Sequence, residues 1–158
     1  MSADLPAVEA NRLHRDLATA MVAFHEAVAR RVGMTAAERK CVGILAELGP
    51  TTPGRLAEAT GLTTGAITGI VDRLERAGFA AREAHPSDRR SILVRACRTD
   101  ELAELTAPAF ASLTKAMTGL VAGYTPQERA IVARHLAKTT LILREETARV
   151  AAMPPPGR

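Results

Sequence analysis

The stretch that decides the fold runs from Thr52 to Ala96 and reads TPGRLAEATGLTTGAITGIVDRLERAGFAAREAHPSDRRSILVRA. Its first part predicts a short helix, because Pro53 suits a first helical position and Gly61 suits a helix end. A second helix is predicted to begin at Thr63 or Thr64. Two short helices joined by a tight turn are typical of a helix-turn-helix motif.

The second of these helices has two chemically different faces. At about 100° per residue, one face carries a stripe of apolar side chains and the other carries small and polar ones. Glycine in a helix interior costs about 0.5–1 kcal/mol relative to alanine, so glycines on the outer face suggest a partner that approaches closely. A solvated face with incidental glycines is the alternative. The apolar face holds Ile67, Ile70, Val71 and Leu74, and the outer face holds Gly65, Thr68, Gly69, Asp72 and Arg76.

After Gly78 the sequence predicts a β-hairpin with a charged tip. Strand-forming residues occupy 79–84 and 91–96, and the sequence His-Pro-Ser-Asp-Arg-Arg at 85–90 separates them. Arginines at such a tip suit a narrow minor groove, which attracts inserted guanidinium groups. The alternative is a surface turn with one Asp–Arg ion pair, worth about 0–1 kcal/mol. The order helix, turn, helix, strand, basic tip, strand indicates a winged helix-turn-helix.

Helices are predicted on both sides of this module. Residues 7–31 carry apolar side chains at steps of three and four, and Thr35 to Glu38 reads as a capping box for a helix that runs to Gly49. The apolar positions of the first helix are Leu13, Leu17, Met21, Phe24 and Val28, and the inward face of the second is predicted to hold Cys41, Ile44, Leu45 and Leu48.

Two further helices are predicted after the hairpin. One starts at Thr99 and contains Pro108, which should kink it because proline removes an amide donor and clashes with the preceding turn. Thr125 to Glu128 is another capping box, and it opens a last helix that extends towards Val150.

These elements predict a mainly α fold with a small β-hairpin wing. Residues 1–34 and 99–150 are interpreted as a helical dimerisation region, 35–98 as a winged helix-turn-helix DNA-binding module, and 151–158 as a disordered tail. Three amphipathic helices at the termini are more than a winged module of this size needs, which favours a second copy as their partner. An intramolecular helical layer is the alternative.

The charge distribution points to an anionic partner for the central module. The chain has 21 basic and 17 acidic side chains, and residues 49–98 hold eight Arg against five acidic residues, which is +3 of the net +4. Eighteen of the 21 cations are Arg, which favours bidentate contacts with phosphate or guanine. A solvated Arg-rich surface is the competing interpretation.

Several classes of protein are excluded by what the sequence lacks. No apolar stretch reaches the ~20 residues that cross a bilayer, and no signal peptide is recognisable, so we expect a cytoplasmic protein without a membrane partner. No catalytic motif or phosphate-cradling loop occurs, so no enzymatic activity and no cofactor are expected. The four histidines lack metal-like spacing, and the two cysteines lack a paired spacing, so no metal site is expected. These residues are His14, His25, His85, His135, Cys41 and Cys97.

Four segments carry a more specific signal: Leu56-Ala57, Gly61-Leu62, VDRLERAGF at 71–79 and Asp88-Arg89-Arg90 before an apolar strand. In these segments the chain resembles the MarR family of transcription factors. The resemblance implies a homodimer that binds a pseudo-palindromic site on double-stranded DNA, with recognition helices in successive major grooves and wings in the flanking minor grooves.

The resemblance also assigns roles to single residues. Arg89 would enter the minor groove with Asp88 bracing it, and Arg90 shares that tip. Thr63, Thr64, Gly65 and Thr68 would face the bases, Thr52 and Arg73 would contact phosphates or position the helix, and Arg76 lies on the same outer face.

A repressor released by a small-molecule effector is the function that the resemblance implies. The effector would bind in the crevice between the dimerisation helices and the winged module, near Met21, Phe24 and His25. The alternative is that the winged module binds an acidic protein partner without sequence-specific DNA binding.

Overall fold

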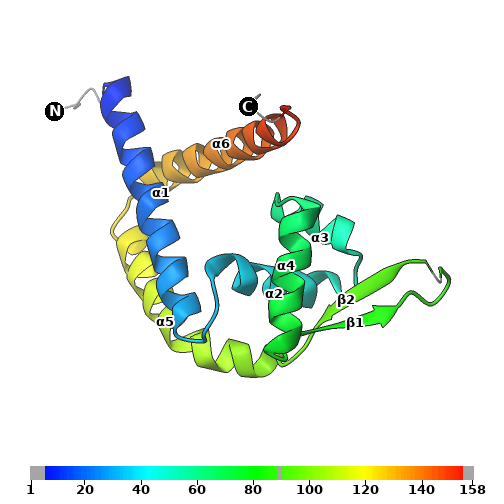
Figure 1. The fold of residues 1–158 in the computed structure, drawn as a ribbon. Coiled ribbons are helices and arrows are strands. Elements are labelled where there is room, and N and C mark those ends of the chain that lie inside the picture. The colour runs from blue at the N-terminus through cyan, green and yellow to red at the C-terminus, as the bar shows by residue number, and fades with distance from the viewer. Residues whose placement is uncertain (1–5, 89, 155–158) are drawn as a thin grey trace.

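The computed structural model describes residues 6–88 and 90–154, which form six helices and one β-hairpin (Figure 1). The prediction of a mainly α chain with a small hairpin wing is therefore confirmed. Arg89 and residues 155–158 of the predicted tail lie outside the described residues. In chain order the elements are α1 (Ala7–Arg30), α2 (Ala36–Leu48), α3 (Pro53–Thr60), α4 (Thr64–Arg76), β1 (Ala80–Ala84), β2 (Ile92–Ala96), α5 (Thr99–Ala122) and α6 (Pro126–Ala151).

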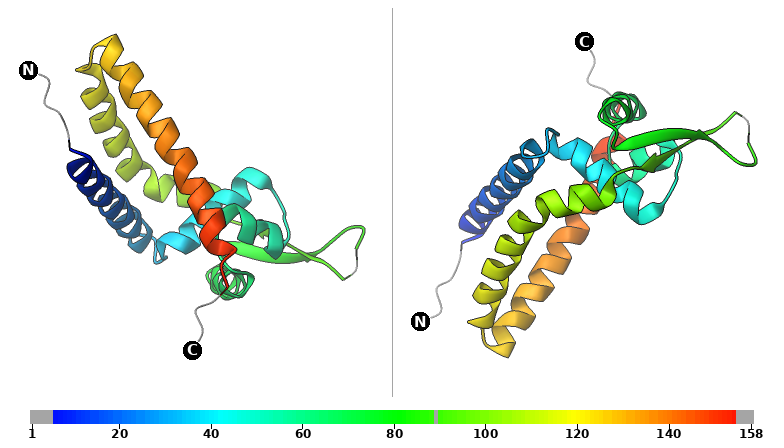
Figure 2. Two further views of the ribbon diagram at one scale, coloured as in Figure 1. Left: turned by 90° about the horizontal axis from the view of Figure 1, so that it is seen from above. Right: turned by 90° about the horizontal axis from the view of Figure 1, so that it is seen from below.

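The elements gather into two regions. We call α2, α3, α4, β1 and β2 the winged lobe, and α1, α5 and α6 the helical arms. Figures 1 and 2 show α1 beside α5, while α6 returns from the far end of α5 towards the winged lobe. The end of α6 approaches the turn between α3 and α4, where a Cβ added at Gly61 would lie 3.5 Å from Cγ2 of Thr147.

The winged lobe has a dense apolar core. Each fully buried side chain of this kind contributes about 1.5–3 kcal/mol relative to exposure. One sequence-based expectation was wrong: Leu48 is 44% exposed, because α2 ends at this residue and its buried stripe passes through Val42 instead. The fully buried side chains are Cys41, Val42, Leu45, Leu56, Ile67, Val71, Leu74 and Val94.

Local capping sets the geometry of the helix-turn-helix. The Thr52 hydroxyl accepts a hydrogen bond from the Arg55 amide at 3.3 Å, and the Thr63 hydroxyl accepts one from the Ala66 amide at 3.2 Å. Between the two helices Gly61 adopts a φ of 73°, a left-handed conformation that strains any residue with a Cβ. The tight turn places α4 across α3 without a long connection.

The hairpin is anchored to the lobe at its base. β1 and β2 pair antiparallel, with Ala80 opposite Ala96 and Ala84 opposite Ile92. On the other edge of β2, Thr51 and Val94 exchange backbone hydrogen bonds of 3.0 and 2.8 Å. The wing therefore starts from a fixed base and projects away from the lobe (Figure 1).

The arms are regular helices with little buried surface. Capping boxes at Thr35 and Thr125 start α2 and α6, as predicted. Pro108 lies inside α5, and the axis of this helix changes direction part-way along its length (Figure 1), which agrees with the predicted kink. None of the residues of α6 is buried. Within the described residues, no helix combines the length and the apolar character that a bilayer crossing requires.

Candidate nucleic-acid interface

The two faces of α4 are separated as the sequence predicts. Ile67 and Val71 are 0% exposed and face the core. On the opposite side Gly65, Thr68 and Asp72 are exposed. The helix is therefore held by its apolar stripe, and its outer face remains open to a partner.

The glycines of this outer face are not required by the fold. A Cβ added at Gly65 would meet no atom within 4 Å, and one added at Gly69 would lie 3.5 Å from Nη1 of Arg73, an ordinary contact distance. The free protein thus has room for larger side chains at both positions. Glycine weakens a helix, so the packing of the free protein gives no reason for glycine at these two positions.

The threonines near the start of α4 present polar groups beside these glycines. The Thr63 hydroxyl caps the helix through its oxygen, which leaves its proton able to donate to a phosphate or a base. Thr68 donates its hydroxyl proton to the Thr64 carbonyl at 3.0 Å, so its oxygen can accept from a base edge. Thr64 itself is exposed at the first position of the helix.

The wing tip is shaped by hydrogen bonds around His85 and Asp88. The backbone amides of Ser87 and Asp88 donate to Nδ1 of His85 at 3.3 and 3.2 Å. The carboxylate of Asp88 accepts from the Arg90 amide at 3.0 Å. Asp88 therefore holds the Arg90 amide at the tip, and the predicted contact with Arg89 lies outside the described residues.

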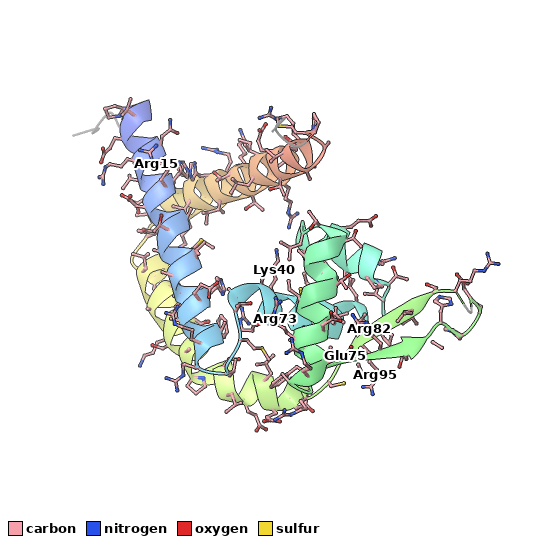
Figure 3. The ribbon with its side chains drawn as sticks, in the orientation of Figure 1. Arg15, Lys40, Arg73, Glu75, Arg82 and Arg95 are labelled. Atoms are coloured by element: carbon pink, nitrogen blue, oxygen red, sulfur yellow. The ribbon has the colours of Figure 1, made fainter. Side chains whose placement is uncertain are left out.

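Arg73 connects α4 to α2. Its Nε donates to Oε1 of Glu38 at 2.5 Å, and Figure 3 shows Arg73 on the side of α4 that faces α2. Burial alone would raise the pKa of the Glu38 carboxyl, but hydrogen bonds from Arg73 and Thr35 outweigh it and hold the pKa below its usual value. Half of the Arg73 side chain remains exposed, so it can both position α4 and contact an anion.

Arg76 lies one turn closer to the end of α4. It is exposed, and its Nε donates to the Asp72 carbonyl at 3.3 Å. Thr52, the other predicted phosphate contact, caps α3 through its side-chain oxygen. Arg73 and Arg76 therefore lie on α4, and Thr52 lies at the start of α3.

Arg82 is a positioning residue that the sequence analysis did not find. It lies on β1 and pairs with Glu75 and Asp72 of α4, with its Nη2 2.7 Å from Oδ1 of Asp72 (Figure 3). The Arg82 amide also donates to Glu75 at 2.8 Å. These bonds fix the wing relative to α4. The alternation along β1 places Arg82 on one face of the strand, but no sequence spacing reveals its partners on another element.

Comparisons with known proteins identify the family. The family model described as "MarR family" matches residues 34–92. An uncharacterized HTH-type transcriptional regulator of Bacillus subtilis (strain 168), YcgE, is 36% identical over 139 residues, covering 88% of this chain and 89% of that protein. The chain belongs to the MarR family.

Two solved structures share the fold of this MarR-family chain. BpsR of Bordetella bronchiseptica, whose DNA binding is regulated by 6-hydroxynicotinic acid, matches with a TM-score of 0.63 at 24% identity, covering 82% of this chain and 91% of its own. A mutant of MarR from E. coli complexed with operator DNA matches with a TM-score of 0.62 at 22% identity, with the same coverages. Membership of this family places the chain among DNA-binding transcriptional regulators.

The residues predicted to hold an effector lie where α1 meets α5 and α2. Phe24 and His25 are partly buried, whereas Met21 is 54% exposed. The rings of Phe24 and Phe110 meet edge to face with centroids 5.7 Å apart. Phe110 could not be predicted as part of this cluster, because nothing in its local sequence pattern shows that α5 passes beside α1.

Arg39 of α2 was also missed, and it is the cation of this cluster in the MarR-family chain. Its Nη2 lies 3.2 Å from Nδ1 of His25, and its guanidinium lies 5.0 Å from the centroid of the Phe110 ring. Within the described part of the chain, the buried Nε of Arg39 has no hydrogen-bond partner. A carboxylate could accept from this group.

Two of the scattered histidines come together in the helical arms. Nε2 of His14 on α1 lies 2.9 Å from Nε2 of His135 on α6, and the rings stack with centroids 5.0 Å apart. The pair ties α1 to α6. Among residues 6–88 and 90–154, no three His, Cys, Asp or Glu side chains are grouped as metal ligands would be.

Proposed function

We propose that this chain is a homodimeric transcriptional repressor that binds a pseudo-palindromic operator and is released from it by a small-molecule effector. The observation that carries the proposal is the outer face of α4. In the free protein a Cβ added at Gly65 would meet open space, one added at Gly69 would make only an ordinary contact with Arg73, and threonine hydroxyls lie beside both glycines. A duplex is the partner that needs such a face, because an α-helix in the major groove brings its backbone close to the base edges.

The surrounding residues take the roles that such docking needs. Thr63, Thr64, Gly65 and Thr68 face the bases, and Arg89 enters the minor groove beside Asp88 and Arg90. Thr52, Arg73 and Arg76 bind phosphates or hold α4 at the correct angle. The net +3 of residues 49–98 supports this assignment, since counterion release from the duplex favours a basic surface.

Selection of operator sequences tests the proposal directly. Purified protein is incubated with random duplexes, bound DNA is sequenced, and affinities are measured by fluorescence anisotropy. We expect an inverted repeat with half-sites about 10 bp apart, and an affinity that falls steeply with salt. Enrichment of no sequence would contradict the proposal, and recovery of an acidic protein on the same face would favour the alternative.

Gly65→Leu tests the close approach of α4, and Gly43→Leu is its matched control. Both glycines are exposed on helices of the winged lobe and have no atom within 4 Å of an added Cβ. Both variants should fold, but only Gly65→Leu should lose operator affinity, by about 1–3 kcal/mol or more. Arg89→Ala should lose a similar amount of binding free energy. Equal affinities for Gly65→Leu and Gly43→Leu would remove the main support for the proposal.

The homodimer is supported by the apolar side chains that the arms leave exposed. On α6 these include Leu136, Leu141 and Leu143, which are 51%, 56% and 61% exposed. Such surface normally marks an interface, and a two-fold dimer buries the same patch of both chains. Sedimentation equilibrium should give twice the mass of one 16.7 kDa chain.

The effector site that we propose includes Met21, Phe24 and His25, together with Arg39 and Phe110, which contact this cluster. Aromatic rings beside a guanidinium suit a small aromatic carboxylate, and the effector named for BpsR belongs to this class. The probes are benzoate and 6-hydroxynicotinic acid, titrated into the protein–operator complex. Release of the operator DNA should be lost in Arg39→Gln and weakened in His25→Ala. It should persist in Arg31→Gln, which alters an exposed arginine outside the cluster.

A further inference from the structure

The joint between the wing and α5 contains an unusual residue. Arg98 directly precedes α5 with φ 51° and ψ 35°, and it is the only non-glycine residue with a positive φ in the described chain. Elsewhere the chain uses glycine for this conformation, as at Gly61 and Gly78. A residue with a Cβ is strained in the left-handed region. The contacts of the Arg98 side chain are therefore the place to look for what offsets this strain.

That side chain contacts the end of α4 on one side. Nη1 of Arg98 donates to the Ala77 carbonyl at 3.2 Å, and the guanidinium carbon lies 4.6 Å from the centroid of the Phe79 ring. The Ala77 carbonyl is one of the carbonyls that a helix end leaves without an intrahelical donor. Phe79 is buried, so the contact is anchored in the core of the winged lobe.

On the other side the same guanidinium contacts the first turn of α5. Nε and Nη2 of Arg98 donate to the two carboxylate oxygens of Glu101 at 2.7 and 2.5 Å. A two-pronged pair of this kind fixes orientation as well as distance. The Arg98 carbonyl also accepts the first hydrogen bond of α5, from the Leu102 amide at 3.0 Å. One residue therefore bonds to α4 and to α5 at once.

We propose that Arg98 is a positioning residue that fixes the angle between α4 and α5, and thereby the spacing at which the dimer reads its two half-sites. This inference rests on the proposed homodimer. In such a dimer α4 reads DNA and α5 belongs to the dimerisation region, so a change of angle at this joint moves the two recognition helices relative to each other. A rigid joint accepts one spacing, and a loose joint accepts several.

The test separates the side chain of Arg98 from its strained backbone. Arg98→Gly removes the guanidinium and adopts the same φ without strain, so the variant should fold. Glu101→Gln leaves Arg98 in place and weakens its paired contact with α5. Arg95→Ala is the control, because Arg95 is an exposed arginine of the wing that pairs with Glu83 and not with α5.

The readout is operator affinity as a function of half-site spacing. Duplexes carry the selected half-sites at the preferred spacing and at spacings one and two base pairs longer or shorter. Wild type and Arg95→Ala should lose about 10²–10⁴-fold in affinity when the two half-sites cannot be bound together. Arg98→Gly should lose less than about tenfold, with Glu101→Gln between them, while all four proteins should bind an isolated half-site equally.

The outcomes distinguish the role of Arg98 from the proposed function. A wild-type spacing preference that Arg98→Gly retains in full would overturn the role of Arg98 and leave the proposed function intact. A wild-type protein that is monomeric, or that binds all spacings equally, would overturn the proposed function and this inference with it. A flattened profile in Arg98→Gly together with an unchanged affinity for the isolated half-site would support a positioning role, because general destabilisation would weaken both.

Discussion

The winged lobe and the helical arms contain similar apolar side chains but bury them very differently. Leu56 of the lobe is 0% exposed, whereas Leu17 of α1 and Leu143 of α6 are 51% and 61% exposed. Where the arms do bury side chains, as at Val28 and Leu102, the residues lie next to the lobe in the chain. The lobe buries its apolar side chains within one chain, whereas the arms leave apolar side chains exposed that a second copy can cover.

The largest expected effect comes from charging the exposed face of α6. Leu136 and Leu143 are seven residues apart and lie on the same side of the helix. Changing both to Glu should prevent dimerisation, because a buried carboxylate without a partner is costly. Operator affinity should fall by about 10²–10⁴-fold, since each half-site is then bound separately. Sedimentation equilibrium and anisotropy measure the two effects.

Arg144→Glu is the control for that double variant. It changes the net charge of the exposed α6 by the same two units but removes no apolar side chain. This variant should remain dimeric. A dimeric Leu136→Glu/Leu143→Glu protein would contradict the assignment of the arms.

The next largest effect is on the free energy of unfolding. It is measured for one leucine of each region in the monomeric Leu136→Glu/Leu143→Glu variant. Leu56→Ala should lower the free energy of unfolding by about 2–5 kcal/mol, because it leaves a cavity in the lobe. Leu17→Ala should cost less than about 0.5 kcal/mol, because that side chain is half exposed without a partner chain. Urea denaturation followed by circular dichroism measures both values. Similar losses would mean that the arms have a core of their own.

The Glu38–Arg73 pair should make the lobe sensitive to acid. The pKa of Glu38 lies below its usual 4.5 in the folded chain, so the carboxylate stabilises the fold above that pH, and this contribution disappears as pH falls through the lowered pKa. Glu38→Gln should cost about 1–3 kcal/mol at pH 7. The difference from wild type should shrink in urea denaturation near pH 3. Glu47→Gln, at an exposed position of α2, is the control and should change the free energy of unfolding at pH 7 by less than about 0.5 kcal/mol.

The smallest effect concerns the two thiols. Burial raises the pKa of Cys41 to about 11, so at pH 8 this thiol is protonated and shielded, while Cys97 is only half buried. Titration with a disulfide reagent should therefore give one fast thiol, lost in Cys97→Ser, and a second that reacts only on unfolding. Because the raised pKa favours the neutral thiol in the folded state, stability should fall as pH rises above about 9. Fast reaction of Cys41 in the native protein would show that the lobe opens readily.

Features that act over a few residues could be predicted from the sequence. The threonine caps at Thr52 and Thr63 and the left-handed glycine at Gly61 all appear where the sequence places them. The apolar stripe of α4 and the strands of the wing follow in the same way. Caps, turns and periodicity depend on bonds between residues at most four apart, so local chemistry suffices.

Only the tertiary structure decided which distant side chains meet. Arg82 of β1 pairs with Asp72 of α4, and Arg98 contacts both α4 and α5. His14 of α1 contacts His135 of α6, which lies near the other end of the chain. Each contact depends on the angle between elements, which is set by the packing of the whole core and leaves no periodic trace in the sequence. The amino-acid order therefore determined the helices, the wing and the two faces of α4, while packing determined how α4 is positioned against the arms.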